Sequence, residues 1–339
     1  MKLSRHKIDK IAVFRALYLG DLLCAVPALK VLRNGFPASE ISLIGLPWAA
    51  SFASRFSAYI DHFIPFPGCP GLPEQAVNED ALMEFRVRMQ KSGFDLILQM
   101  QGNGTVVNAL VEAFGAKVTA GFYPATASSP NSPYFIPYPE DIPEVCRHLQ
   151  LMEALGLSVA GRQPLEFPIF PEDVKDTEAF LPALTQNPFV CIHPGSRSPA
   201  RRWPPKYFAA IGDYCVKKRF TVVLTGTVEE MALCREVRKF MHHDVIDLSG
   251  MTSLGGVGML IREAVLLVSN CTGVSHVADA MQTPSFIISM DGEPRRWAPR
   301  NASIHHVYDW RQDPHFGHVF QQAAAWINEL PTLACYRQC

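Results

Sequence analysis

Long apolar runs and an excess of charge of one sign are both missing from this sequence of 339 residues. No stretch approaches the roughly 20 apolar residues that a membrane-spanning helix needs, and the run from Ile11 to Phe14 is too short for the core of a signal peptide. The 31 Lys and Arg residues are balanced by 32 Asp and Glu, so no global charge attracts nucleic acid or an anionic membrane. We therefore expect a cytoplasmic protein with no nucleic-acid partner and at most peripheral association with the inner membrane.

A disulfide framework and several enzyme signatures are also missing. The nine cysteines are odd in number and scattered, so reduced thiols are expected. Cys335 and Cys339 would supply only half of a metal site, and we predict neither a metal site nor an essential divalent metal. No Gly-x-Gly-x-x-Gly follows the first strand, and there is no P-loop and no Gly-x-Ser-x-Gly elbow. These absences argue against a dinucleotide oxidoreductase, a P-loop kinase and a triad hydrolase.

What the chain does contain is an alternation of short apolar strands with helical stretches. With 48% apolar and 19% charged residues, it can bury two cores. Helical patterns lie at 19–32, 48–58, 75–91 and 144–156, and strand patterns lie at 10–15, 40–46, 95–100, 189–196, 221–226, 264–270 and 285–290. This order predicts βαβ units and parallel sheets, an α/β fold.

Proline is the surplus residue, with 27 in the chain. Many of the prolines gather in two stretches. Residues 122–143 read as a long loop, and such loops are often functional. The stretch 161–188 is where we expect the linker between two domains.

The loop HPGSRSPARRWP (193–204) follows a predicted strand and brings together Arg197, Arg201 and Arg202. Ligands of open α/β sheets bind at the carboxyl ends of strands, and arginine binds phosphate in a bidentate manner. The loop therefore predicts a phosphate site, with a solvated surface turn as the alternative. In SNCTGVSHVADA (269–280), Thr272 and Gly273 open a helix whose N–H groups suit a second phosphate contact. A plain cap with a packed His276 explains the same pattern.

Two loops of the N-terminal half carry further candidates. Asp21 follows the first strand and opens a helix, so its carboxylate stays ionised and can accept a proton; an ordinary helix cap is the alternative. Gln101 and Asn103 end another strand, where amides suit either sugar hydroxyls or a turn. In DGEPRRW (291–297), Asp291 and Glu293 fit a metal or a ribose, or a pairing with the neighbouring arginines.

Seven segments, taken in order, resemble glycosyltransferase family 9, the ADP-heptose lipopolysaccharide heptosyltransferases and their relatives. They are residues 14–37, 114–122, 147–156, 193–204, 247–254, 270–285 and 293–299. The resemblance implies the GT-B architecture, two Rossmann-like domains with parallel sheets facing a central cleft. Residues 1–170 would bind the acceptor and residues 171–339 the nucleotide sugar, with the last helix able to pack back on the N-terminal domain.

The resemblance also implies roles. The reaction would be an inverting transfer, with a heptose from ADP-heptose as the first expectation, no cofactor, and a lipopolysaccharide core, another glycan or a small molecule as acceptor. The general base would be Asp21, and Arg201 would neutralise the leaving diphosphate. Gln101 and Asn103 are acceptor candidates. The donor-binding candidates are Ser196 and Arg197 for phosphate, Glu230 (or its neighbour Glu229) for ribose, Met251 for adenine, and Cys271, Thr272, Gly273 and His276 for the diphosphate and sugar.

One position departs from the family, which usually has Asp where this chain has Cys271. A thiol is a weak hydrogen-bonding group and carries no charge unless its pKa is lowered. The donor sugar could then differ, Asp291 could supply the contact, or activity could be reduced or lost. Two other functions remain open, a sugar-nucleotide epimerase or hydrolase on the same fold and a non-catalytic sugar-nucleotide binder.

Overall fold

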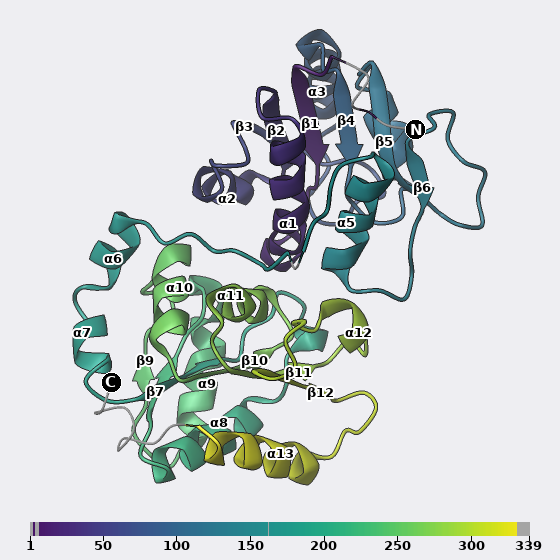
Figure 1. The fold of residues 1–339 in the computed structure, drawn as a ribbon. Coiled ribbons are helices and arrows are strands. Elements are labelled where there is room, and N and C mark those ends of the chain that lie inside the picture. Colours follow the sequence, from purple (N-terminus) through teal and green to yellow (C-terminus); the bar gives the residue numbers. More distant parts are fainter. Residues whose placement is uncertain (1–2, 4–6, 162, 331–339) are drawn as a thin grey trace. The chain divides into compact units, whose positions relative to one another are not determined.

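Two units make up the chain in the computed structural model, which describes residue 3 and residues 7–161 and 163–330. They are Met1–Leu165 and Glu166–Cys339 (Figure 1). Each unit has one six-stranded sheet in which all paired strands run parallel. The predicted fold class, α/β of the GT-B type with two Rossmann-like domains and parallel sheets, is confirmed.

The sheet of the first unit has the strand order β3-β2-β1-β4-β5-β6. Its strands are β1 (Lys10–Phe14), β2 (Glu40–Gly45), β3 (His62–Pro65), β4 (Leu96–Gln99), β5 (Val118–Tyr123) and β6 (Phe135–Pro137). Its helices are α1 (Leu19–Gly35), α2 (Ala50–Arg55), α3 (Glu79–Ser92), α4 (Val107–Glu112) and α5 (Glu144–Ala154), with a 3₁₀ turn at Pro47–Ala49. Because side chains alternate along a strand, Ala12 and Phe14 of β1 pack with α3 and α4 on one face. On the other face α1 packs against α5 (Figure 1).

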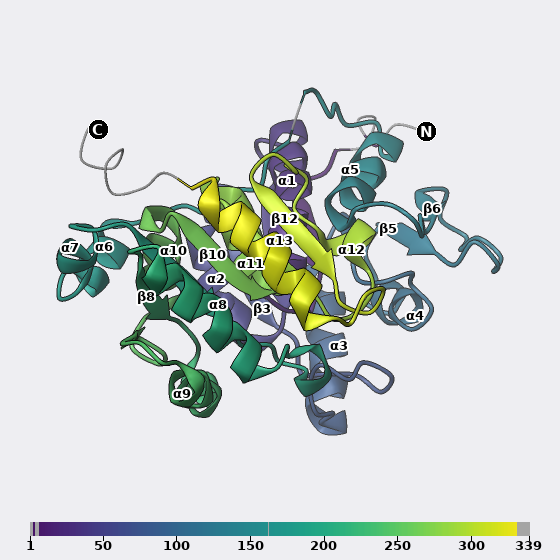
Figure 2. The ribbon, with the colours of Figure 1, turned by 90° about the horizontal axis from the view of Figure 1, so that it is seen from below.

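The sheet of the second unit has the order β12-β11-β10-β7-β8-β9. Its strands are β7 (Phe189–His193), β8 (Thr221–Leu224), β9 (Ile246–Asp247), β10 (Leu266–Asn270), β11 (Ser285–Ser289) and β12 (His305–Asp309). Its helices are α6 (Pro171–Thr177), α7 (Leu181–Leu184), α8 (Pro205–Lys217), α9 (Met231–Phe240), α10 (Leu254–Glu263), α11 (Gly273–Met281), α12 (Pro294–Trp297) and α13 (Phe316–Asn328), with 3₁₀ turns at Pro199–Arg201 and Val228–Glu230. Figure 2 shows α8 and α13 side by side on one face of this sheet, and α10 and α11 lie on the other.

The structure adds elements to those the sequence pattern predicts. The stretch 161–188 contains the boundary between the units and also the short helices α6 and α7, and the long loop 122–143 contains β6. We expected the last helix to be able to return to the N-terminal domain. The last helix of the described chain, α13, packs on α8 of its own unit, where Tyr214 stacks edge-on to Phe320 and donates to Asn328. The expected return to the N-terminal domain stays a prediction. Cys335 and Cys339 lie outside the described residues.

Candidate functional site

In the first unit, Asp21 stands where the chain leaves β1 and begins α1. It is the third residue of α1, so the helix N-terminus stabilises its negative charge. The backbone N–H of Tyr18 donates to Oδ2 of Asp21 over 3.3 Å, and Nη2 of Arg15 lies 3.7 Å from Oδ1. The Asp21 side chain is 22% exposed. Asp21 thus caps the helix, as the alternative interpretation predicts. Its carboxylate is also partly exposed and stabilised by nearby positive charge, so it can accept a proton.

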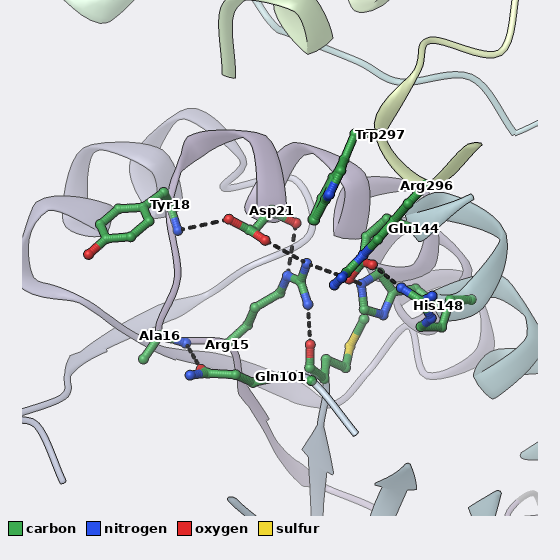
Figure 3. A network of polar contacts seen from close by, with 12 residues as sticks. Arg15, Ala16, Tyr18, Asp21, Gln101, Glu144, His148, Arg296 and Trp297 are labelled. Carbon is green, nitrogen blue, oxygen red and sulfur yellow. Dashed lines mark hydrogen bonds and ion pairs between the residues drawn. The ribbon is translucent and has the colours of Figure 1, made fainter. Parts of the chain in front are cut away.

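A fully buried arginine lies behind this carboxylate (Figure 3). Arg15 donates through Nε to the backbone oxygen of Asp21 over 2.8 Å, through Nη1 to the backbone oxygen of Met100, and through Nη2 to Oε1 of Glu144 over 3.1 Å. Nη1 of Arg147 donates to the other oxygen of Glu144. Sequence reasoning missed this cluster, although Arg directly after a buried strand and Glu-x-x-Arg-His in α5 were visible signals.

His148 belongs to the same cluster and adds no positive charge at neutral pH. Its Nε2 lies 3.3 Å from Oε1 of Glu144, and the ring is buried. Burial, and next the positive charge of Arg15, lower the pKa of His148 to about 4, although the carboxylate of Glu144 acts in the opposite direction. The cluster behind Asp21 therefore contains two arginines, one carboxylate and a neutral imidazole.

The two amides predicted for acceptor binding are engaged in local structure. Oε1 of the buried Gln101 accepts from the backbone N–H of Ala16 over 2.7 Å. Oδ1 of Asn103 accepts from the backbone N–H of Thr105 over 3.1 Å and from its hydroxyl over 2.8 Å. Both contacts fit the turn interpretation, and an acceptor contact for these side chains stays a prediction.

In the second unit, the loops after β7, β8, β10 and β11 leave the carboxyl edge of one sheet, and several of their polar side chains meet. In the loop after β7, Ser196 is buried and its backbone oxygen accepts from Nε of Arg202 over 2.7 Å, so Arg202 shapes the loop. Arg197 is exposed. Arg201 is 45% exposed, and its Nη2 lies 3.4 Å from Oδ2 of Asp291, which follows β11.

Asn270 holds the arginine-rich loop in place. This buried residue ends β10, donates through Nδ2 to the backbone oxygens of Pro194 (2.7 Å) and Gly195 (3.3 Å), and accepts from the backbone N–H of Trp203 over 3.0 Å. Both ends of the loop are thereby fixed to one side chain. Sequence reasoning read Asn270 only as part of a strand end, because its partners are about seventy residues away.

Glu230 lies directly against the glycine of the same loop. A Cβ placed on Gly195 would be 2.2 Å from Oε1 of Glu230, so only glycine leaves room for this carboxylate. The backbone N–H of Thr227 donates to Oε2 of Glu230 over 2.9 Å, and Nε2 of His193 lies 3.6 Å from it. Burial lowers the pKa of His193, against the raising effect of Glu230. A carboxylate fixed in this way suits hydroxyl recognition.

Met251 is 63% exposed, and Val228 is 65% exposed. The backbone brings the two together, because a Cβ on Gly250 would be 3.4 Å from the Cα of Val228. Val228 opens the 3₁₀ turn that ends at Glu230, so both exposed apolar residues belong to segments whose backbones are close to that turn. The apolar face of a nucleobase can pack on such side chains.

The loop after β10 places Cys271, Thr272 and Gly273 at the start of α11. Cys271 is buried and its Sγ lies 3.9 Å from the backbone oxygen of Trp297. Burial, and next the negative charge of Asp291, raise the pKa of the Cys271 thiol to about 12. The thiol is neutral at physiological pH and cannot replace a carboxylate electrostatically. His276 is buried with its ring edge-on to Trp297, which fits the packed interpretation.

Asp291 is a carboxylate close enough to Cys271 for its charge to raise the pKa of the thiol, so it is the candidate to replace the Asp that the family usually has at that position. Its Oδ1 accepts from the hydroxyl of Ser289 over 3.0 Å and from the backbone N–H of Glu293 over 3.2 Å, while Oδ2 faces Arg201. Glu293 accepts from the indole N–H of Trp297 over 3.0 Å, and its Oε2 lies 3.5 Å from Nη1 of Arg296, as the pairing interpretation predicts. Within the described residues, no group of three or more His, Cys, Asp or Glu side chains could hold a metal ion, and none of the described helices could span a membrane.

Known proteins resemble this chain in sequence over part or most of its length. Residues 82–321 match the model of Glycosyltransferase family 9 (heptosyltransferase). Lipooligosaccharide heptosyltransferase 2 of Haemophilus ducreyi is 26% identical over 141 residues, which are 38% of this chain and 40% of that protein. Lipopolysaccharide heptosyltransferase 2 of Escherichia coli K12 is 27% identical over 288 residues, 81% of each chain. The match to the first relative thus spans well under half of its length.

A solved structure resembles this fold. The E. coli ADP-heptose lps heptosyltransferase II superposes with a TM-score of 0.70 at 19% identity, over 94% of this chain and 99% of that one. At this identity the likeness describes the architecture of the backbone.

Proposed function

Since the chain belongs to glycosyltransferase family 9, we propose that it transfers a heptose from ADP-heptose to an acceptor hydroxyl, with inversion at the anomeric carbon. Residues 1–170 would bind the acceptor and residues 171–339 the donor. The acceptor would be a lipopolysaccharide core, another glycan or a small molecule. The protein would act in the cytoplasm, with at most peripheral association with the inner membrane and without a cofactor or an essential divalent metal.

On the acceptor side, Asp21 would be the general base. As the acceptor oxygen attacks the anomeric carbon, its proton becomes much more acidic and passes to a carboxylate oxygen of Asp21. The observation that carries this proposal is the position of Asp21: it is partly exposed at the end of β1, on the first turn of α1, with the Arg15 guanidinium 3.7 Å away. Helix N-terminus and guanidinium both stabilise the ionised form that a base requires.

On the donor side, the bond between the anomeric carbon and the diphosphate oxygen breaks, and ADP leaves with the bonding electrons. Arg201, the Ser196 and Arg197 loop, and the Thr272 and Gly273 amides at the N-terminus of α11 would stabilise the developing charge. Glu230 would accept hydrogen bonds from the ribose hydroxyls. Adenine would pack on Met251, an exposed apolar side chain that follows Gly250, whose backbone lies close to that of the exposed Val228.

The sugar itself would be held near Cys271, with Asp291 as the nearby carboxylate and His276 behind the loop. Because the thiol of Cys271 is neutral, hydrogen bonding to a sugar hydroxyl at this position is weak. The arrangement supports Asp291, held by Ser289 and by the Glu293 amide, as the group that selects the sugar.

The test compares Asp21→Asn with Asp244→Asn, an exposed aspartate of the second unit used as the matched control. ADP release from ADP-heptose is measured with truncated lipopolysaccharides as acceptors, and ADP affinity by calorimetry. Asp21→Asn should bind ADP normally and lose about 100-fold or more in turnover, whereas Asp244→Asn should behave as wild type.

Near-normal turnover of Asp21→Asn would reject Asp21 as the base. Incubation of the wild type with ADP-heptose alone separates the other chemistries, because rapid consumption of donor without acceptor indicates a hydrolase or epimerase. Binding of ADP-heptose with no turnover on any acceptor would indicate a non-catalytic binder.

A further inference from the structure

The side chain of Arg15 is fully buried in the first unit, although burying a guanidinium costs several kcal/mol of lost hydration. A buried ion pair adds little to stability compared with well-packed apolar side chains. A charged side chain at this place therefore points to a role beyond folding.

The three donor groups of Arg15 connect three different elements. Nε binds the backbone oxygen of Asp21 in the first turn of α1, Nη1 binds the backbone oxygen of Met100 just after β4, and Nη2 binds Glu144 in the first turn of α5. The first turn of α1 is thereby fixed relative to the ends of β1 and β4. Asp21 is part of that turn, and Figure 3 shows its carboxylate beside the Arg15 guanidinium.

The charges of the cluster are arranged so that Arg15 also acts on Asp21 electrostatically. Glu144 is shared with Arg147, whose guanidinium donates to the backbone oxygens of Pro139 (2.8 Å) and Glu140 (3.1 Å). His148 is neutral. The guanidinium groups of Arg15 and Arg147 and the single carboxylate of Glu144 together carry a net charge of +1. Oδ1 of Asp21 lies 3.7 Å from Nη2 of Arg15, so it is close to this net positive charge. At this distance the effect on Asp21 is that of a nearby charge and not that of a hydrogen bond.

We propose that Arg15 is a positioning residue for Asp21, and that Glu144 holds Arg15 in its place. This inference rests on the proposed function, because it assumes that Asp21 is the base. Arg15 does not touch the substrate; it fixes the backbone and the charge environment of the group that does.

The test uses Arg15→Met, Arg15→Lys and Glu144→Gln. The matched control is Arg33→Met, because Arg33 is a largely buried arginine of the same unit that pairs with Asp61 and donates to Ser39. Donor KM and ADP affinity should stay within about twofold of wild type, since ADP would bind the second unit. Turnover should fall by about tenfold or more in Arg15→Met and Glu144→Gln, less in Arg15→Lys, and not in Arg33→Met.

The partial rescue by lysine is informative, because an ammonium group keeps the charge but cannot reproduce the planar fork of a guanidinium. It also keeps the test decisive if Arg15→Met does not fold. A double variant, Asp21→Asn with Arg15→Lys, should be no slower than Asp21→Asn alone, because Arg15 acts only through Asp21.

Wild-type turnover in the soluble Arg15→Lys and Glu144→Gln variants, with Asp21→Asn inactive, would overturn the positioning role and leave the proposed function intact. A further loss in the double variant would also overturn it, since Arg15 would then act independently of Asp21. An active Asp21→Asn variant would instead refute the proposed base, and with it the premise of this inference.

Discussion

Replacing Gly195 by alanine should weaken ADP binding about 10- to 100-fold while leaving the fold intact. The new Cβ would lie 2.2 Å from Oε1 and 2.3 Å from Cδ of Glu230, far inside van der Waals contact. The clash involves the end of a flexible side chain, so the Glu230 carboxylate moves and the backbone does not have to. It then loses the 2.9 Å hydrogen bond from Thr227 and its place beside His193.

The magnitude follows from the hydrogen bonds that Glu230 would make to the ribose. A hydrogen bond to a charged group contributes about 1.5–3 kcal/mol, and about 1.4 kcal/mol corresponds to a factor of ten in affinity. Loss of one such bond therefore gives the stated range. Isothermal titration calorimetry with ADP measures it, and thermal unfolding of the same samples reports stability.

Two controls make the result interpretable. Gly45→Ala adds a Cβ whose nearest neighbours are at 3.4 Å, an ordinary contact, and should leave ADP affinity unchanged. Glu230→Ala should weaken ADP binding to a similar extent, and Gly195→Ala should then add nothing further. Wild-type affinity in Gly195→Ala would refute the assignment of Glu230 to the ribose. If Gly195→Ala lowered ADP affinity just as much in the Glu230→Ala variant, the loop, and not the Glu230 carboxylate, would be responsible for the weaker binding.

Two further predictions concern charge. A hydrogen bond from Lys117 lowers the pKa of Asp95 to about 2, so the stabilisation that this carboxylate provides is complete above its ordinary pKa of about 3.9 and is lost as pH falls toward 2. Asp95→Asn should lower the free energy of unfolding by about 2 kcal/mol at pH 7 and by clearly less at pH 3 in urea titrations; an equal loss at both would contradict this origin. Cys271→Asp places a second carboxylate near Asp291, and should change the ratio of kcat/KM between ADP-heptose and other nucleotide sugars; an unchanged ratio and rate would remove this position from sugar selection.

All the strands predicted from the sequence have neighbours on both sides, but β5, which also lies between two strands, was missed. Strands β1, β4, β7 and β10 are continuous apolar runs, because a central parallel strand is buried on both faces. The four edge strands, β3, β6, β9 and β12, were all missed. An edge strand pairs on one side only, so it is short or mixes polar with apolar residues, as in His305–Asp309.

Within the candidate site, local signals and distant contacts divide in the same way. Asp21 at the start of a helix and the arginines after β7 could be recognised in the sequence, because their chemistry depends on a few neighbouring residues. The sequence could not show which of these arginines binds its own loop and which reaches another loop. Arg202 binds back to its own loop, whereas Arg201 reaches Asp291, ninety positions further along the chain.

The sequence alone determined the α/β class, the parallel sheets and most loops that carry polar residues, since burial patterns and turn residues act over short distances. Only the tertiary structure decided that Arg15 donates to Glu144, 129 positions further along the chain, and that the Glu230 carboxylate lies against Gly195. Such pairings form because burial forces each charge to find an opposite charge or a hydrogen bond, and the partner is the one that the folded chain brings near.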